Sequence, residues 1–276
     1  MQIRDYSLPN GWYPRNSDEI CAFLSEFDTL KRSCRAAIAP HAGWYYCGHI
    51  AALGVGSLQP EADTVVVLGG HLPAGTPALF AVEDAVRTPF GHMLIDSELC
   101  NILMKELNGL QDRYRDNTVE VLLPMVHCFF PKVKLLWLRL PAEIESFKAG
   151  QIISQVSLEL NRKVNVLASA DLTHYGRNYG FAPQGTGKAA LKWVRDVNDA
   201  TIIKAIESGN SKEVLRCTEK DSSSCSAGAL LGVMGFAESE NLGNAQLLKY
   251  ATSADIDKGE GIPDSFVGYA ALAFNS

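Results

Sequence analysis

Two histidines of this chain each follow a run of apolar residues that is typical of a buried β-strand. His41 comes just after the run at about 35–39, and His71 follows residues 64–68 across two glycines. Parallel strands bring their carboxyl ends to one edge of a sheet, where ligands usually bind. The two imidazoles are therefore expected to lie close together, although they are far apart in the sequence.

A third apolar run, residues 164–168, leads into a carboxylate and another histidine, Asp171 and His174. Their spacing fits one helical turn or a tight loop. A carboxylate that accepts a hydrogen bond from an imidazole fixes its tautomer and raises its basicity. We therefore predict that His174 acts as a general base, or orients another group, with Asp171 as its partner.

Two further residues offer ligand atoms. Cys225 stands just before the apolar helix expected at 227–236. The unpaired amide groups at a helix start favour a thiolate, which is a good soft ligand for a transition metal. Glu120 offers an oxygen ligand or a hydrogen-bond acceptor.

Each of these residues also has an ordinary structural explanation. Partly buried imidazoles commonly bond to carbonyl groups, free cysteines pack as small apolar residues, and Asp171 suits a helix cap. The functional interpretation is favoured because three histidines follow three strand-like runs that one sheet can bring together. His49, His92 and His127 lack that context, and packing is the expected role of His49 and His127.

The elements that must position these groups alternate between strand and helix, which predicts a single α/β domain over residues 1–276 with no linker or repeat. Strands are expected at 35–39, 63–68, 135–140, 164–168 and 266–272. Helices are expected from a Ser17 cap to about 30, at 47–58, at 96–107, up to about 160 and over most of 185–239. Residues 77–95 read as a loop or short hairpin. Strands near both ends are expected to join one sheet.

Composition narrows the class of protein. The chain has 276 residues, of which 47% are hydrophobic and 20% charged, with a net charge of -6, so clusters of Lys and Arg for binding nucleic acid are not expected. No apolar stretch approaches the roughly 20 residues that span a bilayer, and the start lacks a signal peptide, so a cytoplasmic protein without membrane contact is expected. Seven cysteines without a C-x-x-C motif indicate reduced thiols rather than a disulfide framework.

Several motifs, taken in their order along the chain, resemble those of the Memo family, which belongs to the AmmeMemoRadiSam group. Through this family the chain also resembles the class III extradiol dioxygenases (LigB-like). The resemblance covers nearly the whole chain. The matching segments are Gly11-Trp12-Tyr13-Pro14, the stretch from Ala39 to Gly48, Val119-Glu120 with Leu123-Pro124, the stretch from Ser169 to Gly176, Cys225, and Val267-Gly268-Tyr269-Ala270-Ala271.

This resemblance implies a central, mostly parallel or mixed sheet flanked by helices, and a pocket in which His41, His71 and Cys225 hold a metal ion. Fe(II) is the expected ion, with copper or zinc as alternatives that suit the same ligands. Asp171 and His174 match the pair that lines this pocket, with His174 at the acid/base position. The expected substrate-binding residues are Trp44, Tyr46 and Glu120. Expected partners are a small molecule or a peptide, and AMMECR-type and radical SAM proteins.

The chain departs from the family pattern at two places. Relatives commonly have Glu-His-Ser-x-Glu where residues 116–120 stand, so Asn117 replaces a pocket histidine. They also carry Gly-Pro-Ser-His or Gly-Pro-Asn-His where this chain has Leu68-Gly69-Gly70-His71, so the loop before His71 is shorter here.

Two classes of function remain open at this point. The first is a metal-dependent oxidoreductase or dioxygenase-like enzyme of unknown substrate. The second is a non-catalytic module that uses the same pocket to bind a peptide or protein, which the loss of a histidine at Asn117 favours slightly. Retention of soft and imidazole ligands together favours chemistry, because a peptide groove requires neither.

Overall fold

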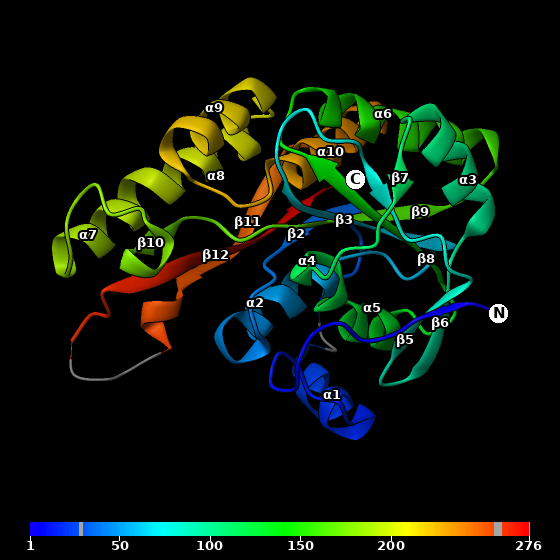
Figure 1. Ribbon diagram of the computed structural model, residues 1–276, viewed down its shortest axis with the longest axis horizontal. Helices are drawn as coiled ribbons and strands as arrows, with labels where there is room; N and C mark the ends of the chain where they lie inside the picture. Colours follow the sequence, from blue (N-terminus) through cyan, green and yellow to red (C-terminus); the bar gives the residue numbers. More distant parts are fainter. Residues whose placement is uncertain (28–29, 257–260, 276) are drawn as a thin grey trace.

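A mixed β-sheet forms the centre of the computed structural model, which describes residues 1–27, 30–256 and 261–275 (Figure 1). Within these ranges the strand order is β10 (His174–Gly176), β12 (Ser265–Phe274), β2 (Ala36–Ala39), β9 (Val164–Ser169), β3 (Thr64–Leu72), β8 (Lys134–Pro141), β4 (Leu79–Phe80) and β7 (Leu110–Gln111), and β11 (Ala245–Thr252) also pairs with β12. The predicted α/β class, with a mixed sheet flanked by helices, is confirmed.

Four neighbouring strands, β2, β9, β3 and β8, run parallel, and they position the chemistry. Their β-branched and apolar residues are buried on both faces of the sheet, as expected for parallel strands covered by helices. Ala39 pairs with Ser169, and Leu68 with Ala168, so the carboxyl ends of β2, β9 and β3 lie at one edge.

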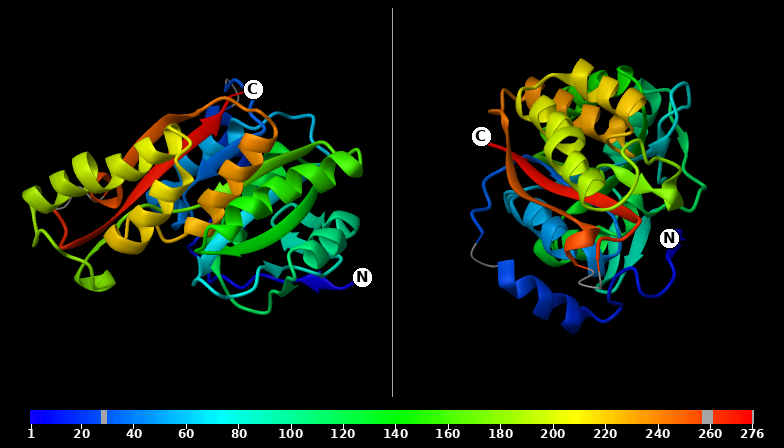
Figure 2. Two further views of the ribbon diagram at one scale, coloured as in Figure 1. Left: turned by 90° about the horizontal axis from the view of Figure 1, so that it is seen from above. Right: turned by 90° about the vertical axis from the view of Figure 1, so that its left-hand side faces the viewer.

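Helices cover both faces of the sheet (Figures 1 and 2). One layer consists of α6 (Glu145–Glu159), α8 (Ala200–Glu207), α9 (Ser211–Asp221) and α10 (Ala227–Ser239), and the opposite layer of α1 (Ser17–Leu24), α2 (Trp44–Gly56) and α5 (Leu123–Phe129). The remaining helices are η1 (Ser25–Phe27), α3 (Ser97–Glu106), α4 (Asn117–Glu120), η2 (Arg177–Tyr179), α7 (Lys188–Trp193), η3 (Val194–Asp199) and η4 (Ser253–Asp255). A Cβ on Gly150 of α6 would lie 1.9 Å from the carbonyl oxygen of Gly232 in α10, so glycine is required where these helices meet.

A small second sheet joins β1 (Ile3–Arg4) to the hairpin of β5 (Ala85–Thr88) and β6 (Gly91–Leu94). This hairpin lies where the sequence predicts a loop or short hairpin. The largest hydrophobic core is one cluster whose members range along the chain from Tyr13 to Phe274. Strand β12, near the carboxyl end, pairs with β2, so strands near both ends join one sheet as predicted.

Several boundaries differ from the sequence-based expectation. The side chain of Asn16, not Ser17, caps α1 by accepting from the amides of Asp18 and Glu19. The expected helix at 47–58 starts at Trp44, because the backbone of Gly43 already accepts helical bonds. Strands β10 and β11 are not predicted by the sequence, and half of the residues of β11 are exposed, so it lacks the apolar pattern of the inner strands. Among the described helices, none combines the length and apolar character needed to cross a bilayer.

Candidate metal centre and its cavity

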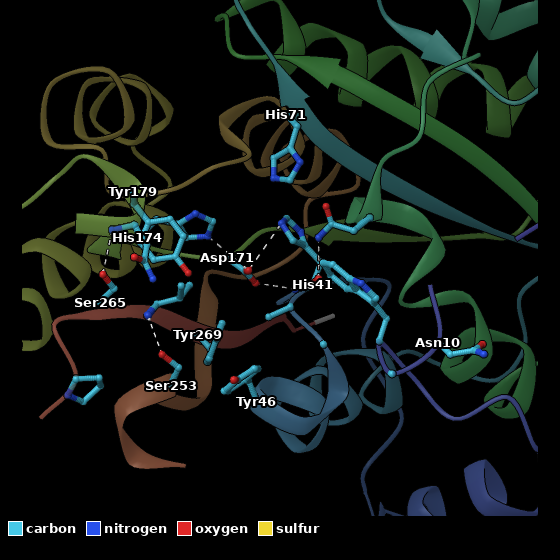
Figure 3. A pocket seen from close by; sticks show the side chains of 18 residues that line it. Asn10, His41, Tyr46, His71, Asp171, His174, Tyr179, Ser253, Ser265 and Tyr269 are labelled. Carbon is cyan, nitrogen blue, oxygen red and sulfur yellow. Dashed lines mark hydrogen bonds and ion pairs between the residues drawn. The ribbon is translucent and has the colours of Figure 1, made fainter. Parts of the chain in front are cut away.

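Three ligand-type side chains converge at the carboxyl edge of the parallel strands. His41 follows β2, His71 lies near the end of β3, and Cys225 comes just before α10. One potential ligand atom from each lies within 4.8 Å of the others. Nε2 of His41 is 3.2 Å from Sγ of Cys225. The rings of His41 and His71 meet edge to face with centroids 5.0 Å apart, and Figure 3 shows both.

The tautomer of His41 follows from its hydrogen bonds. Its Nδ1 is 2.9 Å from Oγ of Ser169, and that hydroxyl donates its only proton to the carbonyl of Thr118. Oγ of Ser169 must therefore accept from Nδ1–H of His41. This leaves the lone pair on Nε2, the atom that faces Cys225.

His71 is oriented by a carboxylate in the same way. Its Nδ1 is 2.9 Å from Oδ2 of Asp116, which only accepts when ionised, so Nε2 is the atom that carries the lone pair when the ring is neutral. Nη2 of Arg139 lies 3.2 Å from the same oxygen, and the amide and hydroxyl of Thr118 donate to the other oxygen. Burial alone would raise the pKa of Asp116, but the bonds from His71 and Thr118 and the charge of Arg139 lower it to about 2.

The backbone at His71 is unusual. Its φ is 58°, in the left-handed region, where a residue other than glycine is uncommon. The preceding Gly70 passes so close to Ser226 that a Cβ would lie 2.3 Å from its hydroxyl. The strand expected to end at 68 continues to Leu72 as β3, and Gly69 and Gly70 within it let β3 approach the start of α10 and bring the imidazole of His71 to Cys225.

Charge favours a thiolate at Cys225. Burial would raise the pKa of this thiol, but the charge of His41 and hydrogen bonds with His41 and His71 outweigh burial and lower it to about 5. Burial would conversely lower the pKa of His71, but its bonds with Asp116 and Cys225 raise it to about 10. At neutral pH the metal-free centre therefore holds a thiolate beside imidazolium, and a bound cation would replace that positive charge.

The carboxylate of Asp171 lies between the imidazoles of His41 and His174. Its Oδ1 accepts from the amide of His41 at 2.7 Å, while its Oδ2 is 3.9 Å from Nε2 of His41 and 3.6 Å from Nε2 of His174 (Figure 3). Burial would raise the pKa of Asp171, but the charge of His41 and the proximity of His174 lower it. Burial would lower the pKa of His174, but Asp171 and Cys225 raise it. Nε2 of His174 is enclosed and has no hydrogen-bond partner closer than Asp171 among the described residues.

A cavity of about 720 Å³ opens onto these groups, and His41, His71, Asp171 and His174 all line it (Figure 3). Its aromatic and amide walls come from distant segments of the chain: Asn10, Trp12, Tyr46, Asn117, Asn178, Tyr179 and Tyr269. Asn117, which stands where relatives have histidine, donates Nδ2–H to the carbonyl of His41 at 3.0 Å. Among the described residues that line the cavity, none is a lysine or an arginine.

Of the three residues expected to bind substrate, only Tyr46 lies on the cavity wall. Trp44 is buried against Phe23, 5.4 Å between ring centroids, and donates its indole N–H to the carbonyl of Val121. Position 44 faces α1 and α4 because the first turn of α2 directs residues 44 and 46 to different sides of the helix.

Glu120 holds the N-terminal segment, residues 5–16, instead of lining the cavity. Its carboxylate accepts from the amides of Ser7 and Leu8 and, at 2.8 Å, from the hydroxyl of Tyr13. A buried carboxylate requires such donors, and the N-terminal segment supplies them. Glu120 thereby positions Asn10 and Trp12 on the cavity wall without touching the cavity itself.

A buried polar cluster joins the segment just before His174 to the segment just before Cys225. Asn198 donates to Oγ1 of Thr173 and to the carbonyl of Asp221, and accepts from Ser223. The adjacent Asp199 accepts from the amide and hydroxyl of Thr173. Sequence reasoning missed this cluster, and its only signal is the pair of polar residues in an otherwise helical stretch.

The carboxyl of Asp199 is expected to make stability pH-dependent. Burial raises its pKa to about 6 despite bonds from Thr173 and Tyr250. Between about pH 4 and 6 the folded protein therefore holds a proton that the unfolded chain releases, so this group's stabilising contribution is lost as the pH rises through 6. When the pH rises from 4.5 to 7.5, the free energy of unfolding of Asp199→Asn should increase relative to that of wild type by about 2 kcal/mol.

Urea unfolding at both pH values measures this difference. Asp196→Asn, on the exposed side of the same helix, serves as the control and should track wild type. Parallel stability profiles for wild type and Asp199→Asn would contradict the expectation.

The chain is similar to several known proteins over most of its length. The sequence profile of the family described as "Memo-like protein" matches residues 4–273. A "MEMO1 family protein" of Methanococcoides burtonii is 29% identical over 98% of this chain and 99% of its own length. Another, from Pyrobaculum arsenaticum, is 25% identical over the full length of both chains. The crystal structure of an uncharacterized Escherichia coli K12 protein aligns with a TM-score of 0.47 and 13% identity, covering 86% of this chain and 98% of that one.

Proposed function

Because the chain belongs to the Memo family, we propose that it binds one transition-metal ion through His41, His71 and Cys225 and acts as a metal-dependent, dioxygenase-like oxidoreductase. The observation that supports this most directly is the convergence of two oriented Nε2 atoms and one thiolate within 4.8 Å. Such a set matches the ligand preferences of first-row transition metals.

The surroundings of the three residues also fit a metal. Each imidazole binds an acceptor through Nδ1, as metal-bound histidines usually do, so that Nε2 is directed inward. The low pKa of Cys225 means that little free energy is needed to form the thiolate at neutral pH. We propose Fe(II) as the resident ion, with copper or zinc as alternatives for the same donors.

A bound redox-active ion would supply electron transfer to or from a substrate held in the cavity. His174 lines the cavity beside the centre, and we assign to its imidazole the transfer of a substrate proton, while its enclosed Nε2 faces Asp171. Asp171 fixes the backbone of His41 and holds its other oxygen toward His174, so it positions both residues. Tyr179 and Tyr269 supply aromatic surface on the wall of this cavity.

Metal reconstitution tests this proposal. Protein purified without oxygen is incubated separately with Fe(II), Cu(II) and Zn(II), desalted, and assayed for metal and protein. Wild type should retain one ion per chain, and His41→Ala and His71→Ala should retain almost none. His49→Ala is the matched control, because His49 is exposed on α2 and contacts Glu26, Phe23 and Phe27 rather than the candidate metal centre.

Equal metal content in wild type and both site variants, with folding verified by circular dichroism, would falsify the metal centre. The rival function, a peptide-binding module, would then be favoured by the half-exposed Tyr46 and Tyr179 on the cavity wall. Comparison of the three ions in the same assay also identifies the preferred metal.

A further inference from the structure

Two cysteines outside the candidate metal centre touch each other on the opposite side of α2. Sγ of Cys21 in α1 lies 3.8 Å from Sγ of Cys128 in α5. Four other cysteines, Cys34, Cys47, Cys100 and Cys217, are buried. Cys21 is exposed and Cys128 half-buried. We propose that Cys21 and Cys128 form a reversible intrachain disulfide, a redox modification site independent of the metal centre.

The geometry requires little movement. The sulfur atoms are in van der Waals contact, and a disulfide brings them to about 2.05 Å. Rotation of the Cys21 side chain can supply most of this change, because its surface is open to solvent. Helices α1 and α5 already pack against each other, so the backbones need not approach from a distance.

The chemistry balances with a hydroperoxide as the oxidant. The exposed Cys21 thiolate attacks one peroxide oxygen, the O–O bond breaks, and a sulfenic acid and hydroxide form. The Cys128 thiolate then attacks that sulfur and displaces a second hydroxide, which leaves as water after protonation. Two thiols lose two electrons and two protons in total, and hydrogen peroxide becomes two molecules of water. A dithiol reductant reverses the bond by exchange.

The proposed bond has a structural consequence for the cavity. Asn10 and Trp12, on the cavity wall, lie in the segment that leads into α1, and Asn117 lies in the short helix before α5. A covalent link between α1 and α5 joins the segments that carry these walls. The two cysteines are 107 positions apart, so the link also closes a long loop and restricts the unfolded chain.

Peptide mapping tests the proposal. Full-length protein is treated with hydrogen peroxide, alkylated without reduction, digested and analysed by mass spectrometry. The expected product is a Cys21–Cys128 peptide pair that lacks two hydrogen atoms and disappears after dithiothreitol. Oxidised wild type should also melt higher than reduced wild type by at least about 3 °C, because the crosslink closes a long loop.

Matched variants separate this bond from other thiol chemistry. Cys21→Ser and Cys128→Ser should each lose both the linked peptide and the melting shift, whereas Cys225→Ser should retain both. The reduced variants are first compared with wild type by circular dichroism, to establish that they fold. The proposal is overturned if Cys21 is oxidised to a sulfinic acid without forming the disulfide, or if two copies of the chain join through Cys21. It is also overturned if alkylation after the peroxide treatment still modifies both thiols completely.

Discussion

Cys225→Ser is expected to weaken Zn²⁺ binding by about 100-fold or more, since loss of a direct ligand should cost at least as much as loss of a residue that only orients one. The thiolate is the only anionic group among His41, His71 and Cys225, and its pKa of about 5 keeps it charged at neutral pH. A serine hydroxyl stays neutral and is a harder, weaker donor for these metals. Competition with a chromogenic chelator at pH 7 measures the affinity.

A second readout comes from the Co²⁺-substituted protein. Wild type should show a thiolate-to-metal charge-transfer absorption, and Cys225→Ser should lack it while keeping weaker ligand-field bands from the imidazoles. Cys21→Ser, which removes an exposed thiol far from the centre, should leave affinity and spectrum unchanged. If Cys225→Ser bound Zn²⁺ within threefold of wild type, the thiolate would have no place among the ligands.

Arg139→Met should lower the free energy of unfolding by about 3–5 kcal/mol, because it removes the partner of two buried carboxylates. Nη1 of Arg139 lies 3.5 Å from Oδ1 of Asp112, Nη2 lies 3.2 Å from Oδ2 of Asp116, and Nε donates to the carbonyl of Gly70. Methionine preserves much of the volume but leaves both carboxylates without that charge. The loss should also release Asp116, and with it the ring of His71.

Guanidinium unfolding at neutral pH measures the change, with Arg87→Met as a control. Arg87 pairs with Asp5, and because both side chains are exposed this pair should contribute only about 0–1 kcal/mol. Similar losses in the two variants would mean that the buried pairs stabilise the fold no more than a surface pair does. A double variant, Arg139→Met with Asp116→Asn, should recover part of the loss by removing one unpaired charge.

The sequence predicted which segments form neighbouring parallel strands better than it predicted the contacts around them, although β3 runs to Leu72 rather than ending at 68. Apolar runs before His41 and His71 and after residue 163 were sufficient to predict adjacent parallel strands, because a buried parallel strand requires such runs. The location of Cys225 at a helix start was predicted for the same reason, from the apolar residues of α10.

Long-range polar contacts were beyond that reasoning. Asp116 meets His71 across 45 positions, and Ser169 meets His41 across 128, and no periodic pattern relates such pairs. Glu120 illustrates the same limit in reverse. A carboxylate is a suitable residue type for a cavity wall, but the location of this side chain is set by hydrogen-bond donors of the N-terminal segment. That segment lies beside Glu120 only in the folded chain.

The placement of β2 also constrains when the centre can assemble during protein synthesis. Ala36 of this strand pairs with Val166 on one side and Phe274 on the other, so both neighbours of β2 are translated long after it. A growing chain therefore exposes His41 and His71 to the surrounding metal ions well before Cys225 exists. The three proposed ligands coexist only after Cys225 has been made, and the sheet around β2 is complete only after β12. If the proposed centre binds a metal, the three-ligand site would therefore form late in the synthesis of the protein.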